Sequence, residues 1–131
     1  MLTGLDHVLV PIPEGKEDTA RAFYGSFLGL QELAKPAPLR ARGGVWFALP
    51  DGRQLHLGVE KPFVPQKKAH PCFRTLDLRQ VMEHFDRQGV AYVQDHTLDV
   101  ARIFTSDPWG NRLEIVQGEH KSILPLEKTH P

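Results

Sequence analysis

The segment 107–116, which reads DPWGNRLEIV, decides the fold because its pattern already occurs once earlier in the chain. Turn residues come first, and the strand that follows places Glu114 between two aliphatic residues. Residues 51–59, which read DGRQLHLGV, have the same order: an Asp-Gly turn typical of a hairpin, then His56 between two leucines. His56 and Glu114 therefore occupy equivalent positions in two related halves of the chain.

Each half also opens with a strand that carries a histidine, His7 in the first and His70 in the second. An amphipathic helix follows each opening strand, and in the second half Asp77 is a plausible N-cap residue for it. The predicted strands are 5–12, 30–34, 44–49, 54–60, 70–76, 91–94, 101–106 and 112–116, the predicted helices are 20–28 and 78–88, and residues 35–44 are predicted to form a loop.

The order of elements is thus βαβββ written twice, in modules of about 3–61 and 69–118. We expect an α+β fold in which two tandem βαβββ modules form a curved, cup-shaped mixed sheet with helices on the outer face. One domain would span 1–120, and the polar segment 119–131 would be a tail.

The four repeated positions lie on the strand faces that the aliphatic residues leave free. A single histidine on a strand is usually a hydrogen-bonded residue, but four candidates at equivalent positions indicate a common site. Imidazole and carboxylate together suit a divalent ion such as Zn, Ni, Mn or Fe(II). The sequence therefore predicts a metal site built from His7, His56, His70 and Glu114.

Other residues on the same faces have a functional and a structural interpretation. Arg74 and Arg102 could hold an anionic substrate or form ion pairs, and Trp46 and Phe104 could be substrate-wall aromatics or ordinary packing. Cys72 could be a nucleophile, although a small residue lining the cavity is the better expectation. Glu60, like Glu114, is a candidate catalytic carboxylate, and it could instead pair with a nearby lysine.

Composition narrows the classes of partner. Lys+Arg and Asp+Glu both number 16, which gives no basic surface for nucleic acid. The single cysteine excludes an intramolecular disulfide framework and favours a reducing compartment. No apolar run reaches the ~20 residues that a membrane span needs, and the first residues do not read as a signal peptide. We expect a cytoplasmic protein that acts on a small molecule, without a membrane or nucleic-acid partner.

Taken together, residues 2–118 resemble the vicinal oxygen chelate superfamily, which includes glyoxalases, bleomycin-resistance proteins and extradiol dioxygenases. The motifs that carry the resemblance, in chain order, are LDHVLVPI, AFYGSFLGL, LHLGVE, AHPCFRTLDL and DPWGNRLEIV. The resemblance implies paired βαβββ modules, often completed by a homodimer, and a divalent metal held by His7, His70 and Glu114. His56 stands where glyoxalase I members place a glutamate as a fourth ligand, so it is the one expected to turn away if any does.

Three kinds of function follow from the resemblance. The leading expectation is a glyoxalase-like, metal-dependent lyase or isomerase whose metal stabilises an oxyanion on a substrate with adjacent oxygens. A drug-sequestering binding protein of the bleomycin-resistance type is the alternative. A dioxygenase is disfavoured because those members are usually longer chains.

Overall fold

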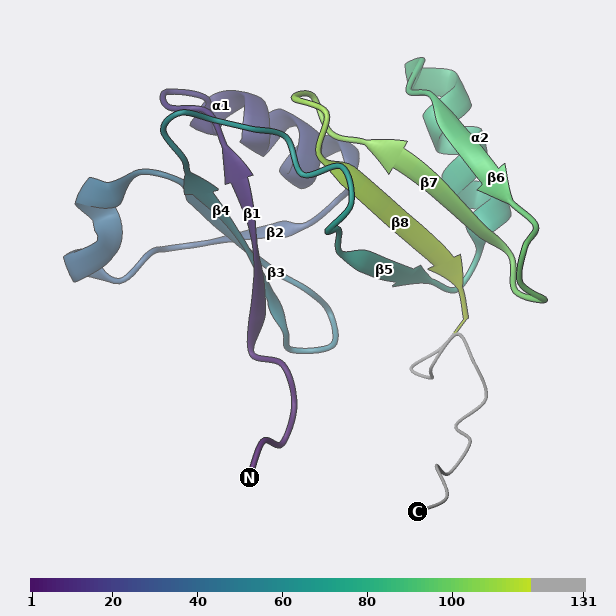
Figure 1. Cartoon of the computed structure of the whole chain (residues 1–131), viewed down its shortest axis with the longest axis horizontal. Coiled ribbons are helices and arrows are strands. Elements are labelled where there is room, and N and C mark those ends of the chain that lie inside the picture. Colours follow the sequence, from purple (N-terminus) through teal and green to yellow (C-terminus); the bar gives the residue numbers. More distant parts are fainter. Residues whose placement is uncertain (119–131) are drawn as a thin grey trace. The chain divides into compact units, whose positions relative to one another are not determined.

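A computed structural model describes residues 1–118, so the predicted tail at 119–131 lies outside the described residues. The chain divides into two compact units, each built on one four-stranded mixed sheet (Figure 1). Unit 1 comprises Met1–His70 together with Asp107–Asn111, and unit 2 comprises Pro71–Ser106 and the chain from Arg112 onward. The predicted pair of βαβββ modules in an α+β fold is confirmed.

The sheet of unit 1 has the strand order β1-β4-β3-β2. Strand β1 runs parallel to β4, and the other neighbours are antiparallel. The elements in chain order are β1 (His7–Ile12), α1 (Glu17–Ala20), a π-helix (Arg21–Phe27), β2 (Gln31–Leu33), a 3-10 helix (Ala37–Arg42), β3 (Val45–Ala48) and β4 (Gln54–Val59).

The core of unit 1 lies on the sheet face that carries the aliphatic residues. Strand register places Leu55 and Leu57 of β4 opposite Phe47 and Val45 of β3, and all four are buried. The π-helix adds Tyr24, whose ring lies 6.3 Å from that of Phe47. Because side chains alternate along a strand, His56 and its cross-strand partners Leu9 and Trp46 lie on the opposite face, as predicted.

Unit 2 repeats the arrangement with the strand order β5-β8-β7-β6. Asp77 caps the helix as predicted, because its carboxylate accepts a hydrogen bond from the backbone N–H of Gln80. The helix ends at Gly89, which adopts the left-handed conformation. The elements are β5 (Cys72–Thr75), α2 (Leu78–Gln88), β6 (Tyr92–Asp95), β7 (Arg102–Ser106) and β8 (Arg112–Gln117).

Three local predictions need correction. The first helix is α-helical only over Glu17–Ala20 and continues as a π-helix, in which the N–H of Leu28 bonds to the carbonyl of Phe23. Residues 37–42 of the predicted loop form a 3-10 helix. Strand β5 begins at Cys72, so His70 precedes the strand in which we expected it.

The turn between β7 and β8 belongs to unit 1 and is held there by buried polar groups. The carboxylate of Asp107 accepts hydrogen bonds from the Tyr24 hydroxyl at 2.7 Å and from the Asn111 side chain at 2.8 Å. The Asn111 side chain also donates to the carbonyl of Pro11 and accepts from the N–H of Gln66. Asn111 is almost fully buried, and each of these bonds satisfies a group that water cannot reach.

Candidate functional site

Equivalent strands of the two units carry matching rows of side chains on the face away from the aliphatic core. In unit 1 the row is Leu9, His56 and Trp46, on β1, β4 and β3. In unit 2 it is Cys72, Glu114 and Phe104, on β5, β8 and β7. Each unit therefore presents its predicted site residues on one face, as the alternation predicted, but the two rows differ in chemistry.

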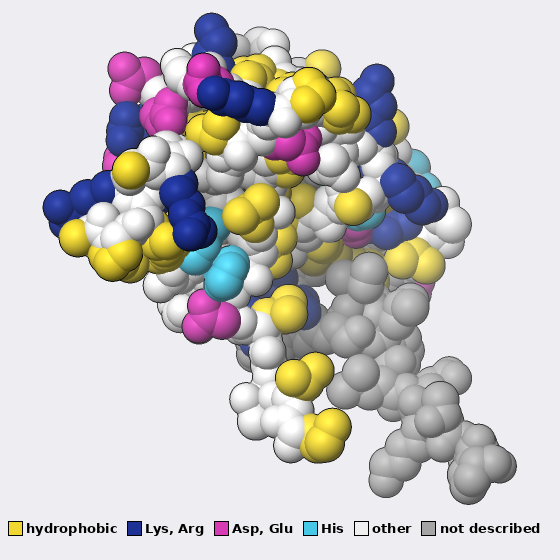
Figure 2. All heavy atoms as spheres, turned by 60° about the vertical axis from the view of Figure 1, so that its left-hand side comes forward, with side chains coloured by type: hydrophobic (Ala, Val, Ile, Leu, Met, Phe, Trp, Pro, Cys, Tyr) yellow, Lys and Arg dark blue, Asp and Glu magenta, His cyan; other side chains and the backbone are white. Residues whose placement is uncertain are grey.

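His7 lies on β1 two residues before Leu9, and therefore on the same face. Its ring stacks on that of His56, with ring centroids 4.0 Å apart. It is partly exposed, and Figure 2 shows histidine side chains next to one another at the surface. The Nδ1 atom of His7 lies 2.9 Å from a carboxylate oxygen of Asp6. Because a carboxylate only accepts, Nδ1 carries a proton, and in the neutral ring the lone pair is therefore on Nε2. This is the usual orientation of a metal-binding imidazole.

His56 is held differently. Its ring is buried between His7 and Trp46, and the Trp46 ring lies parallel to it at 3.7 Å. Its Nε2 atom lies 2.8 Å from the side-chain oxygen of Gln54. Burial lowers the pKa of His56 below its ordinary value, and the adjacent His7 lowers it further. His56 is therefore a neutral ring whose Nε2 is engaged within its own strand.

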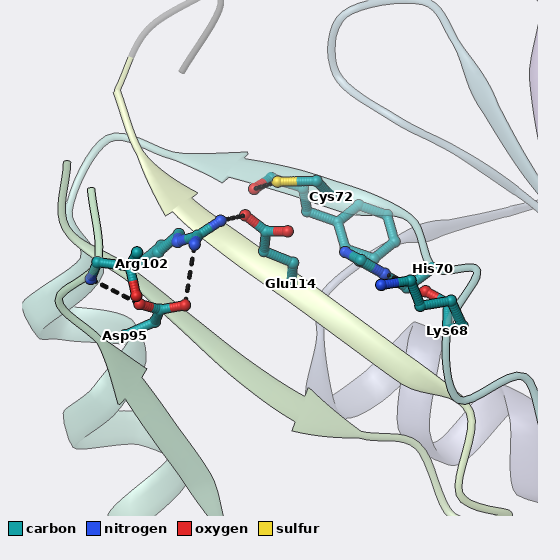
Figure 3. A network of polar contacts seen from close by, with 8 residues as sticks. Lys68, His70, Cys72, Asp95, Arg102 and Glu114 are labelled. Atoms are coloured by element: carbon teal, nitrogen blue, oxygen red, sulfur yellow. Dashed lines mark hydrogen bonds and ion pairs between the residues drawn. The ribbon is translucent and has the colours of Figure 1, made fainter. Parts of the chain in front are cut away.

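His70 repeats the orientation of His7. Its Nδ1 atom lies 2.8 Å from the backbone carbonyl of Lys68 (Figure 3). A carbonyl, like a carboxylate, only accepts a hydrogen bond, so His70 also carries its lone pair on Nε2. Two histidines at equivalent positions thus have the same proton arrangement, although different neighbours produce it.

Glu114 is buried in the centre of the unit 2 sheet and forms an ion pair with Arg102. The Arg102 guanidinium donates to Glu114 at 3.1 Å and to Asp95 at 2.9 Å (Figure 3). Arg102 is itself largely buried, with 13% of its side chain exposed, and its Nε atom has no hydrogen-bond partner among the described residues. The structure thus places Arg102 in a largely buried ion pair, whereas the predicted alternative was an ion pair at the surface or at an interface.

Cys72 lies beside Glu114 on the neighbouring strand. Burial raises the pKa of the Cys72 thiol to about 12, and the charge of Glu114 and a hydrogen bond with it add to the increase. Arg74 and Arg102 act in the opposite direction but do not offset it. A thiol with this pKa is protonated near neutral pH, which does not suit a nucleophile.

The remaining predicted site residues lie as follows. Glu60 comes just after β4, and its carboxylate accepts a hydrogen bond from the N–H of Val64. Trp46 packs on His56, while Phe104 lies between the guanidinium groups of Arg102 and Arg112 at 5.1 and 4.1 Å. Sequence reasoning missed Arg112, although its position two residues before Glu114 places it on the same face of β8.

The donor chemistry of His7, His70 and Glu114 fits a divalent metal, whereas the Nε2 atom of His56 is engaged by Gln54. With Nδ1 bonded to an oxygen, the neutral rings of His7 and His70 have their lone pairs on Nε2, and Glu114 forms an ion pair with Arg102. The residues are distributed over both units. Among residues 1–118, no group of three or more His, Cys, Asp or Glu side chains that could hold a metal ion is present. No described helix is long and apolar enough to cross a membrane.

Comparison with known proteins relates the chain to glyoxalases. A glyoxalase family protein from Bacillus anthracis has a crystal structure that matches with a TM-score of 0.87 and 42% sequence identity, over 91% of this chain and 98% of that one. The protein named Glyoxylase I 4 from Arabidopsis thaliana is 27% identical over 95% of this chain and 76% of its own length. No family model matches the sequence.

The same fold also occurs in a binding protein. The antibiotic-binding protein TnmS3 from Streptomyces matches with a TM-score of 0.70 over 90% of this chain and 98% of that chain. Its identity is 22%, so the likeness extends to the fold alone. Enzymes and binding proteins therefore share this architecture, and the residues of the site have to separate them.

Proposed function

Because the chain belongs to the glyoxalase family, we propose that it is a divalent-metal-dependent lyase or isomerase that acts on a small substrate with adjacent oxygen atoms. The observation that carries the proposal is the shared orientation of His7 and His70. Each ring donates from Nδ1 to an oxygen, so each presents the Nε2 lone pair to a ligand.

In this proposal His7, His70 and Glu114 hold the metal. A bound divalent ion would polarise the substrate oxygens and stabilise negative charge that develops on them. Asp6 and the carbonyl of Lys68 orient the two imidazoles, and Arg102 forms an ion pair with Glu114 within the sheet. His56 contributes a neutral ring against which His7 packs.

The role of Glu60 as a general base is a separate prediction. Its carboxylate accepts from Val64, so it would have to take a substrate proton while it keeps that bond. Glu60→Gln preserves the acceptor oxygen and removes the base. We expect this variant to bind metal normally and to lose turnover once a substrate is identified.

Metal titration of the full chain tests the proposal. Protein stripped with a chelating resin should gain roughly 8–14 °C in Tm when Zn, Ni, Mn or Fe(II) is added at about 100 times its dissociation constant. His7→Ala and Glu114→Gln should lose most of that gain. His96→Ala removes an exposed loop histidine and should retain it. Absence of both bound metal and a Tm gain in the wild-type protein would refute the proposal.

A second candidate function is supported by the aromatic stack of unit 1. His7, His56 and Trp46 lie in parallel layers, and exposed Leu5 and Leu9 lie on the same strand or just before it. Such a surface could bind a flat aromatic drug without any metal. Retention of micromolar binding to bleomycin by a His70→Ala, Glu114→Ala double variant, which leaves the stack intact, would favour this candidate over the enzyme.

A further inference from the structure

Two arginines of unit 2 lie against the same aromatic ring but differ in how their charges are compensated. The Arg102 guanidinium lies 5.1 Å from the Phe104 centroid and that of Arg112 lies 4.1 Å from it. Arg102 is paired with two carboxylates, those of Asp95 and Glu114. Arg112 has no ion pair with any residue in the part of the chain that the structure describes. It is thus a half-buried cation with its donors available.

Packing against Phe104 orients this cation. A guanidinium that lies over an aromatic face keeps its edge donors directed sideways, while its planar surface is covered. The five N–H groups of arginine form a planar fork that matches the two oxygens of a carboxylate. Packing on Phe104 therefore orients Arg112 for an anionic ligand without occupying its N–H donors.

The position of Arg112 relates such a ligand to the proposed metal site. Arg112 and Glu114 are two residues apart on β8, so their side chains leave the same face of the sheet at Cα atoms about 7 Å apart. A ligand whose carboxylate is bound to Arg112 would therefore extend along this face toward Glu114, one of the proposed metal ligands. One small molecule could span both positions.

We propose that Arg112 binds a carboxylate of the substrate, so that the substrate class is a small oxygenated carboxylic acid. The identification of this ligand as the substrate rests on the proposed function, whereas carboxylate binding at Arg112 does not. Phe104 orients the guanidinium, and Arg102 offsets part of the negative charge of Glu114 and Asp95, which reduces their repulsion of the anion. Arg102 is thus a positioning residue here, and Arg112 is the residue that contacts the ligand.

The test is a titration of the metal-stripped full chain with propionate, followed by nitrogen–proton NMR spectra. Propionate has one carboxylate and no second oxygen group with which to chelate a metal. We expect millimolar binding with shifts at the Arg112 side chain and at neighbouring amides of β7 and β8. Propionamide, the neutral isostere, should produce none. Arg112→Gln should weaken binding about tenfold, as expected for the loss of a charge-assisted hydrogen bond.

Control variants keep the outcome decisive. Arg79→Gln removes an exposed arginine of α2 that pairs only loosely with Glu83, and it should bind propionate as the wild type does. Arg112→Lys retains the charge without the planar fork, so its affinity for propionate should lie between those of the wild type and Arg112→Gln. The lysine variant also tests the proposal if the glutamine variant does not fold. Equal binding by all variants, or tighter binding of inorganic phosphate than of propionate, would overturn the carboxylate assignment. Metal binding without propionate binding would refute this inference alone, and the reverse result would refute the proposed function alone.

Discussion

The two histidines at equivalent positions show how single neighbours decide what a side chain can do. His7 is oriented by a carboxylate from the preceding residue, and His70 by a carbonyl two residues earlier. His56 has the same ring, but Gln54 engages its Nε2 and two aromatic rings enclose it. Spacing in the sequence marked all three as candidate ligands. It could not reveal which nitrogen each ring presents, because that depends on contacts of less than 3 Å.

Removal of the Asp6 carboxylate should weaken metal binding although Asp6 is not a proposed ligand. Asp6→Ala leaves His7 free to rotate and to change its protonated nitrogen, and such changes typically cost ~10-fold or more in metal affinity. Asp6→Asn keeps an acceptor oxygen and should have a smaller effect. Competition against a chromophoric chelator measures both variants. An unchanged affinity for Asp6→Ala would show that this hydrogen bond does not orient a metal ligand.

The Cys72 thiol should react slowly and should limit stability at alkaline pH. Its pKa of about 12 means that the folded protein holds this proton at pH values where the unfolded thiol, with a pKa of 9.0, has lost it. The contribution to stability is therefore complete below about pH 9 and declines as the pH rises from 9 toward 12. Iodoacetamide alkylation should be much slower than that of a free thiol at pH 8.

Glu114→Gln provides the matched comparison for this thiol. The substitution removes the negative charge that helps to keep the Cys72 proton in place, so the variant should be alkylated several-fold faster at the same pH. The same measurement on urea-unfolded protein gives the rate without the effect of the fold. Alkylation of the native wild type at the unfolded rate would contradict the raised pKa of this thiol.

At the scale of elements, the sequence predicted type and order well and local detail poorly. Alternation along 54–60 and 112–116 gave the correct strands and faces, and the Asp77 cap was visible in the residues themselves. The π-helix was not predictable, since the apolar positions of Phe23 and Tyr24 fit an α-helical stripe equally well. Both of these adjacent rings are buried in the π-helix. Tertiary packing selects this wider helix, and local propensity does not indicate it.

Two glycines test how strongly the hairpin of unit 1 depends on backbone conformation and on space. Gly44 and Gly52 both have φ near +90°. A Cβ atom on Gly44 would lie 2.2 Å from the carbonyl oxygen of Leu57, whereas one on Gly52 would meet nothing within 4 Å. Gly52→Ala should cost about 1–2 kcal/mol from backbone strain alone.

Gly44→Ala should cost well above that, roughly 3 kcal/mol or more, because β3 must also move away from β4. Urea unfolding monitored by tryptophan fluorescence measures both variants. Their difference isolates the steric contribution, since the backbone strain is common to both. If the two variants were equally stable, the close approach of residue 44 to β4 would not exist in solution.

At the scale of the whole chain, the internal repeat accounts for what could be predicted about the site, and divergence between its halves accounts for what could not. The repeat alone relates His7 to His70 and His56 to Glu114. The row of unit 1 became neutral and aromatic, with Trp46 and His56 in contact, while that of unit 2 became charged around Arg102. The repeat did not single out Arg112, because the equivalent position in the first half is the uncharged Gln54.

The exposed end of β1 leads to the last prediction, that two copies of the chain associate. Strand β1 lies at the edge of its sheet, and its first half is exposed. Leu2, Leu5, Val8 and Leu9 form an apolar run along and just before this strand, whereas β6, one of the two edge strands of unit 2, exposes only Val93 among the large apolar residues described on it. An unpaired edge with apolar side chains favours pairing with another chain.

Light scattering should therefore give twice the chain mass of 14.8 kDa at micromolar concentrations. Leu5→Glu places a charge in the apolar run outside the proposed metal ligands, and it should shift the protein toward the monomer. Val93→Glu makes the same change on β6, an edge strand of unit 2, and should leave the dimer intact. A wild-type monomer at 100 times these concentrations, or dissociation by Val93→Glu in place of Leu5→Glu, would show that β1 is not the interface.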